Sequence, residues 1–258
     1  MGALTRQVFW PAPDFCRYVL NTRESMYKNV DEAMSNLAEW KKCRKEKVEP
    51  RVKNMAYRPT FNAECFREAA FCRFYELAES TFELYTLNFL VGAGVTARSA
   101  QETIAAIWFI NSKLEHLTKT KDLSHFVQSM KRLSLGWSSV EGFPEKNNVL
   151  KYIDSVDKIM DGRFRQHYNM LSEYAHPNYS GMLGVYSQAN HETLEVTFGF
   201  NPHGQRVLKN HIESTLMICI GLLRPIQEGY EKIINEALKV CLELHEQGRL
   251  KEQFYNQI

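Results

Sequence analysis

Apolar side chains recur at intervals of three and four residues along most of this sequence, the spacing that gathers them on one face of a helix. The longest such stretch begins at Phe61 and continues to Phe89, with aromatic residues throughout. A long core helix is therefore expected there, with Gly92 and Gly94 supplying its break. A second amphipathic stretch runs from Ser25 and includes Trp40, which predicts another helix.

Further helical patterns fill much of the remaining chain. They are expected at Phe15–Tyr18, in the segment that contains Arg98, and over Asp122–Leu135, Val149–Met160 and Phe164–Ala175. From Gln205 the helical spacing returns and continues towards the carboxyl end, which predicts a long last helix that Pro225 kinks.

One segment changes to the period of a strand. Between Met182 and Phe200, apolar residues alternate with polar ones on either side of the turn sequence QANHET, which predicts a β-hairpin. The expected fold class is all-α: a bundle of long helices with one small β-hairpin inserted before the C-terminal helix. Pro50 and Pro59 bracket a linker, so residues 1–60 are expected to form an N-terminal arm and helices packing on the core, and residues 61–258 the main helical domain.

The composition is that of a folded chain, and its charge balance makes one class of partner less expected. Of the 258 residues 44% are hydrophobic, enough for a sizeable core, and 32 basic residues nearly balance 30 acidic ones, which disfavours a general polyanion binder. A local basic run follows Trp40. It contains Lys41, Lys42, Arg44, Lys45 and Lys47. This run either complements the carboxyl end of its helix or contacts a phosphate backbone.

The cysteines and histidines follow no metal-binding pattern. The six cysteines include no CxxC pair, and the histidines include no HExxH motif, so no metal and no cofactor are expected. Reduced core cysteines predict a cytoplasmic setting, with Cys65 and Cys72 on one buried helix face. The longest apolar run, Leu216–Leu223, is too short to span a bilayer, so no membrane association is expected.

Two groups of polar residues are candidates for chemistry. On one predicted helix, Arg98 and Glu102 are four residues apart and therefore lie on one face. In YNMLSEYAHPN, Ser172 and His176 have the same spacing, and Pro177 ends the helix at His176. These groups form either a reaction site or a buried polar network that locks helices together.

The RSAQE helix, followed downstream by YNMLSEYAHPN and a small hairpin, resembles a set of bacterial all-α proteins that is similar to the HEPN superfamily (higher eukaryote and prokaryote nucleotide-binding domain). The resemblance covers about Phe61–Leu223. It implies a helical bundle that forms homodimers and a metal-independent endoribonuclease or RNA-binding effector of a defence or toxin–antitoxin system. Its partners would be RNA and a protein such as an antitoxin.

The resemblance also implies roles for individual residues. His176 matches the histidine of the family, whereas the positions of the family's arginine hold Asn169, Met170 and Leu171. Arg98 on a neighbouring helix would then supply the cation, with Ser172 and Glu102 completing the catalytic set. Tyr168, Asn169 and the basic run Lys41, Lys42, Arg44 and Lys45 would hold the substrate. The alternative is a non-catalytic binding or oligomerisation module in which Arg98, Glu102, Ser172 and His176 are structural.

Overall fold

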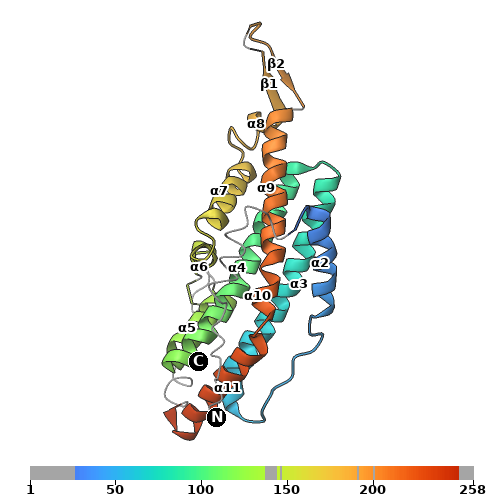
Figure 1. The fold of residues 1–258 in the computed structure, drawn as a ribbon. Coiled ribbons are helices and arrows are strands. Elements are labelled where there is room, and N and C mark those ends of the chain that lie inside the picture. The colour runs from blue at the N-terminus through green and yellow to red at the C-terminus, as the bar shows by residue number, and fades with distance from the viewer. Residues whose placement is uncertain (1–26, 137–143, 146, 191, 200, 250–258) are drawn as a thin grey trace, which may run out of the picture.

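The protein is seen in a computed structural model that describes residues 27–136, 144–145, 147–190, 192–199 and 201–249. Helices dominate these residues, and a two-stranded hairpin precedes the C-terminal helices (Figure 1). The prediction of an all-α bundle with one small hairpin is therefore confirmed. The helix expected at Phe15–Tyr18 lies outside the described residues. Within them, every helix is too short or too polar to span a bilayer.

The elements follow one another with short connections. In chain order they are α2 (Val30–Lys42), η1 (Met55–Tyr57), α3 (Arg58–Thr86), α4 (Leu90–Thr120), α5 (Leu123–Ser134), α6 (Leu150–Asp157), α7 (Arg163–Ala175), α8 (Leu183–Tyr186), β1 (Ser187–Ala189), β2 (Val196–Phe198), α9 (Pro202–Gly221), α10 (Leu223–Gln227) and α11 (Tyr230–Glu246).

The two longest helices, α3 and α4, form an antiparallel pair whose turn is not where the glycines are. Asn88 adopts φ 63° and makes the turn, because asparagine tolerates the left-handed region better than most residues. The predicted break at Gly92 and Gly94 is wrong, since both residues lie inside α4. Gly94 instead permits close packing: a Cβ there would lie 3.4 Å from Leu208 of α9.

Helix α4 is the centre of the bundle, because it packs against α3, α5, α6, α7, α9 and α11. Its first half is rich in buried alanines, which let the neighbouring helices approach closely. Two of its buried amides bond to neighbouring backbone. Gln101 donates to the Phe164 carbonyl at 2.7 Å and Asn111 donates to the Ile226 carbonyl at 3.1 Å. These bonds fix the starting point of α7 and the position of α10.

Helix α2 covers one side of the bundle. Its buried residues Ala33 and Leu37 belong to the same hydrophobic cluster as α3 and α4, and it also packs against α9. Asn29 caps it by accepting a hydrogen bond from the Glu32 amide at 2.9 Å.

The predicted single C-terminal helix is divided into three. Helix α9 ends at Gly221, the short α10 contains Pro225, and α11 starts after Gly229. Gly229 has φ 81°, a left-handed conformation that ends the preceding turn and redirects the chain. The sequence predicted one helix with a kink at Pro225, whereas the structure divides this stretch at Leu222 and again at Gly229.

The hairpin extends beyond the end of the bundle (Figure 1). Its strands pair antiparallel, with Ser187 opposite Phe198 and Ala189 opposite Val196. The predicted alternation is present, but it buries no face of the strands: the side chains of β2 are all exposed.

The base of the hairpin depends on a close backbone contact at Gly204, the third residue of α9. A Cβ at Gly204 would lie 1.8 Å from the Gly184 carbonyl oxygen, whereas a Cβ at Gly92, the third residue of α4, meets nothing closer than 3.5 Å. We expect Gly204→Ala to lower the free energy of unfolding by about 1–3 kcal/mol. Gly92→Ala should leave it unchanged or raise it by up to about 1 kcal/mol. Urea unfolding of both variants measures the difference, and equal effects would contradict the close contact.

Candidate functional site

Three of the predicted site residues meet where α4 faces α7. The Arg98 Nε lies 3.2 Å from Glu102 Oε1, and the Tyr168 hydroxyl donates to the same oxygen at 3.1 Å. The Arg98 guanidinium carbon also lies 5.5 Å from the centre of the Tyr168 ring. Both charged side chains remain about 30% exposed, so this Arg98–Glu102–Tyr168 cluster is joined to solvent on one side.

The other α7 candidates do not join this cluster. The Ser172 hydroxyl donates to the Tyr168 carbonyl of its own helix at 2.8 Å, and Asn169 accepts a bond from Arg165 at 3.1 Å. His176 is the C-cap of α7, as Pro177 predicted, and its side chain is exposed. Within the described residues, no hydrogen bond or ion pair connects His176 with Arg98.

The helix axis gives the separation of these groups. His176 follows Tyr168 by eight residues, so at 1.5 Å per residue it lies about 12 Å further along α7. Arg98 is held at the level of Tyr168 by its ring contact. A nucleophile and a general base need hydrogen-bond reach, directly or through one water. The sequence thus identified one real cluster and one separate exposed histidine.

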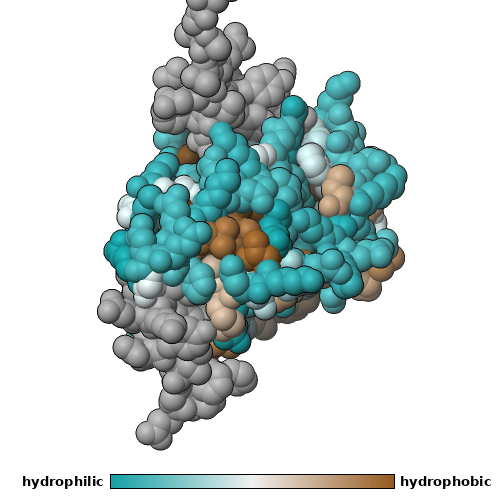
Figure 2. All heavy atoms as spheres, turned by 90° about the horizontal axis from the view of Figure 1, so that it is seen from below, coloured by the Kyte–Doolittle hydropathy of each residue, from teal (hydrophilic) through white to brown (hydrophobic). Residues whose placement is uncertain are grey.

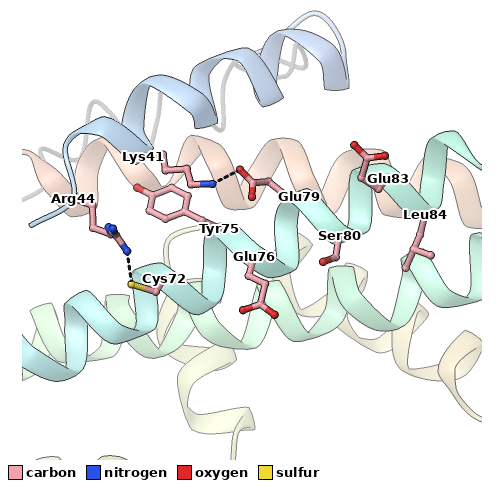
Figure 3. Close-up of a pocket in the computed structure, with 9 residues that line it drawn as sticks. All are labelled: Lys41, Arg44, Cys72, Tyr75, Glu76, Glu79, Ser80, Glu83 and Leu84. Atoms are coloured by element: carbon pink, nitrogen blue, oxygen red, sulfur yellow. Dashed lines mark hydrogen bonds and ion pairs between the residues drawn. The ribbon is translucent and has the colours of Figure 1, made fainter. Parts of the chain in front are cut away.

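The predicted basic run lies at the end of α2, beside a cavity of about 570 Å³ between α2 and α3 (Figure 3). Lys41 is ion-paired with Glu79 at 2.7 Å, and Lys42 with Glu39 at 2.7 Å. The Arg44 guanidinium lies 2.9 Å from the sulfur of Cys72 (Figure 3). The prediction that Cys72 is buried beside Cys65 is wrong. Cys72 is exposed, because the face of α3 that carries it lines this cavity.

Lys45 belongs to a charged network that no sequence motif indicated. Its ammonium contacts Glu64 at 2.6 Å and Glu231 at 2.7 Å, and Arg51 contacts the same two carboxylates. Burial raises the pKa of Glu64, but hydrogen bonds from Arg51 and Lys45 outweigh it, so the net pKa is lowered. The network joins the segment after α2 to α3 and α11.

A second buried charge lies next to this network. Arg67 is 2% exposed and donates to Glu68 at 2.7 Å and to Gln227 at 2.6 Å. Its guanidinium stacks 3.5 Å from the centre of the Tyr230 ring. Burial lowers the pKa of Arg67 despite these partners. Arg67 therefore fastens α3 to α10 and α11, as a structural contact.

A smaller cavity of about 410 Å³ lies beside Glu102 and is lined by parts of α3, α4, α5 and α6. We call it the α4 pocket. Its apolar lining includes Phe66, Leu133 and Val149, and its polar lining includes Arg73 and Arg132. Arg73 donates to Thr103 at 3.2 Å. Within the described part of the chain, neither arginine forms an ion pair with a carboxylate.

Lysines extend this positive surface along α4 and α6. Tyr152, which lines the α4 pocket, packs against Phe109 with ring centres 5.0 Å apart and ring planes inclined at 56°. The ammonium of Lys113 lies 4.9 Å from the Phe109 ring. Burial lowers the pKa of Lys113, and the nearby charges of Lys158 and Lys151 lower it further.

The surface formed by Arg73, Lys113, Arg132, Lys151 and Lys158 is named here the basic face. No ion pair with a carboxylate of the described residues involves any of them, in contrast to the lysines that follow α2. Sequence reasoning missed the basic face because its members are isolated cations on four different helices. The aromatic pair Phe109–Tyr152 lies among these three lysines and two arginines, but the two rings are far apart in the sequence and only the fold brings them together.

Two histidines face one another between α7 and α9. The Nδ1 atoms of His167 and His211 are 3.2 Å apart. Burial lowers the pKa of His167 to about 4, with a smaller contribution from His211, and burial also lowers the pKa of His211. The pair is therefore neutral in the folded protein at pH 7. No group of three or more potential metal ligands occurs among the residues the structure describes.

Comparison with known proteins assigns no family: the chain matches no protein-family model, no curated protein and no solved structure.

Removing the buried carboxylate of Glu64 from the charged network should lower the stability of the fold. We expect Glu64→Gln to lower the free energy of unfolding by about 2–4 kcal/mol, because Glu64 is 3% exposed and compensates two cations. The control Glu79→Gln removes an exposed partner of Lys41 and should cost less than about 1 kcal/mol. Chemical denaturation at pH 7 compares them, and a loss no larger than that of the control would contradict the structural role of the network.

The histidine pair should make stability depend on pH. The pKa of His167 is lower in the folded than in the unfolded state, so between pH 6.5 and about 4 the unfolded chain binds more protons. Stability is therefore lost as the pH falls through this window. Between pH 7.5 and 5 we expect a loss of about 1–2 kcal/mol, allowing for partial solvent access. Denaturation of His167→Gln should show a smaller loss, and an unchanged loss would refute this assignment.

Proposed function

We propose that this chain is a HEPN-like helical protein that binds RNA in the cytoplasm without cleaving it, and that the basic face holds the phosphate backbone. The observation that carries the proposal is a set of cations that have no carboxylate partner among the described residues, two of which, Arg73 and Arg132, line a pocket with apolar walls. Lys41, Lys42 and Lys45, in the basic run that the sequence suggested as a phosphate contact, are instead paired with carboxylates. Lysine and arginine side chains that neutralise phosphates release the counterions condensed on the nucleic acid, which favours binding.

The α4 pocket suits a nucleotide unit of that RNA. Its volume of about 410 Å³ lies within the usual range for small-ligand sites. Phe66, Leu133 and Val149 offer apolar contacts to a base, and Arg73 and Arg132 offer planar donor groups to a phosphate. Glu102 also lines the pocket, but the bond from Arg98 compensates its charge and reduces its repulsion of an anion. Recognition of an unpaired nucleotide by apolar contacts and arginines is typical of single-stranded RNA binding.

The separation of His176 from Arg98 favours binding over cleavage. Metal-independent cleavage needs a proton acceptor and a cation at the same phosphodiester, and the backbone of His176 lies about 12 Å along α7 from Tyr168, the residue that Arg98 contacts. Arg98 instead contacts Glu102 and the Tyr168 ring, an arrangement that fixes α7 on α4. In this proposal the protein is an RNA-binding effector of a defence or toxin–antitoxin system, as the resemblance implies. Its protein partner would be one such as an antitoxin.

Binding should depend on the basic face and on salt. We expect the double variant Lys151→Gln, Lys158→Gln to bind a single-stranded RNA about tenfold more weakly at low salt. The magnitude of the slope of log affinity against log salt should fall by about 1.4, because each of the two lost phosphate contacts on a single strand contributes about 0.7. Fluorescence anisotropy of a labelled oligonucleotide, with EDTA present, measures both quantities.

The matched control removes the same charge from the predicted basic run. The double variant Lys41→Gln, Lys42→Gln should change the affinity for RNA less than twofold, because the two ammonium groups are already ion-paired with Glu79 and Glu39. Equal effects of the two double variants, or absence of RNA binding by the unaltered protein, would refute the proposal. RNA cleavage that His176→Ala abolishes without loss of thermal stability would refute its non-catalytic part.

A further inference from the structure

The cavity of about 570 Å³ between α2 and α3, named here the α2–α3 cavity, has no part in the proposed RNA binding. None of the residues that line it belongs to the α4 pocket or to the basic face (Figure 3). Its volume lies within the usual range for small-ligand sites. Its walls combine an unpartnered buried hydroxyl, a cation and several carboxylates, and these groups define the chemistry of a ligand.

The hydroxyl of Tyr75 lacks a partner among the described residues. Tyr75 is 2% exposed, and its hydroxyl oxygen is buried without a hydrogen bond. Figure 3 shows this hydroxyl directed towards the end of the cavity at which Arg44 lies. Burial raises the pKa of Tyr75, so the hydroxyl remains protonated at pH 7 and can donate. A buried polar group without a partner is unfavourable, and a ligand atom that accepts from it would remove this cost.

Arg44 supplies a cation at the same end of the cavity. Its guanidinium lies 2.9 Å from the sulfur of Cys72 and forms no ion pair with a carboxylate in the described part of the chain. A guanidinium has five N–H donors, so most of them remain for a ligand carboxylate. The end of the bundle opposite the hairpin is mostly hydrophilic (Figure 2), and there Lys121 and Glu243 instead compensate one another at 2.7 Å.

Carboxylates continue along the wall that α3 provides. Glu76, Glu79 and Glu83 occur at intervals of three and four residues, which places them on one side of the helix. Glu79 is paired with Lys41 at 2.7 Å, whereas Glu76 and Glu83 are exposed and form no ion pair within the described residues. Glu76 lies one helical turn, about 6 Å along the axis, from the cysteine that Arg44 contacts. The cavity thus has a cationic end, followed at a short distance by negative charge.

We propose that the α2–α3 cavity binds a small zwitterion of the size of a dipeptide or tripeptide. Its carboxylate accepts hydrogen bonds from Arg44 and Tyr75, and its ammonium group donates to Glu76. A simple anion would be repelled by the carboxylates of α3, and a simple cation by Arg44 and Lys41, so a ligand with both charges is the better complement. An extended dipeptide or tripeptide spans about 7–10 Å, which covers the separation of the two ends, whereas a single amino acid is too short.

Alkylation of Cys72 reports whether the cavity is occupied. Cys72 and Cys43 are both exposed, but only Cys72 lines the cavity. The probe is triglycine at about 10 mM and low salt, ten times an expected dissociation constant of about 1 mM. It should slow the alkylation of Cys72 by iodoacetamide at least fivefold and leave that of Cys43 unchanged, as mass spectrometry of the two cysteine peptides measures. Triglycine acetylated at its amino end, or amidated at its carboxyl end, should protect much less.

Two variants test the carboxylate end, with protection always taken relative to the same variant without triglycine. Tyr75→Phe keeps the ring, which packs against Phe71 and Phe74, and removes only the hydroxyl. It should bind triglycine at least threefold more weakly, with a melting temperature that is unchanged or higher. Arg44→Gln should bind at least fivefold more weakly. The control Lys42→Gln removes the same charge from a residue that does not line the cavity, and it should bind normally.

The contrary results are equally specific. Absence of protection by triglycine, or equal protection by its capped forms, would overturn the proposal, because a zwitterion would then not be recognised. Unchanged binding in Tyr75→Phe and Arg44→Gln would overturn it as well, since the ligand would lie elsewhere. A lower melting temperature of Tyr75→Phe would show that the hydroxyl already has a partner. Full binding by Glu76→Gln would refute the placement of the ammonium group.

Discussion

The burial of α4 on nearly every side is the constraint on which the rest of this structure depends. Seven helices of the described chain, α10 included, pack against it, so its small residues set how closely they approach and its polar side chains must find partners inside the protein. Gln101 and Asn111 do so through backbone carbonyls of α7 and α10. Where α4 reaches the surface, Arg98 and Glu102 are partners of one another, and Tyr168 also bonds to Glu102. The candidate site is therefore built on the most firmly held element of the fold.

This constraint explains why the site contains both a structural and a binding feature. The Arg98–Glu102–Tyr168 cluster positions α7, and the same Glu102 lines the α4 pocket. The pocket lies between α3, α4, α5 and α6, and these four helices also carry the basic face. A rigid central helix with cations on its neighbours holds charges at fixed separations, which lowers the ordering cost of binding an anionic chain.

Periodicity predicted most of the helices because each one has an apolar face to bury. The end of α7 at His176 was also predictable, since proline excludes the helical conformation before it. The α3–α4 break was misplaced because glycine can either end a helix or permit close packing within one, and only the neighbouring Leu208 distinguishes the two cases. Likewise, the basic run looked like a ligand surface in the sequence, but Lys45 pairs with Glu64 and Glu231 of distant elements, which no local pattern indicates.

For the residues of the site, too, local sequence patterns predicted only contacts between neighbours on one helix. Arg98 and Glu102 were identified because they are neighbours on one helix, and their contact with Tyr168 followed from the packing of α7. The Arg67 stack on Tyr230 and the basic face could not be identified, because their members are separated by long stretches of chain and share no motif. Local patterns thus predicted elements and local pairs, whereas the clusters formed by tertiary packing required the fold.

The most direct test of the account is to map where RNA touches the protein. Hydrogen exchange of backbone amides, measured with and without a single-stranded oligonucleotide in EDTA, resolves the contact along the chain. The account predicts protection concentrated in α6, the end of α5 and the stretch of α3 near Arg73, with none around His176. Protection confined to the segment around His176, or to the end of α2, would contradict it.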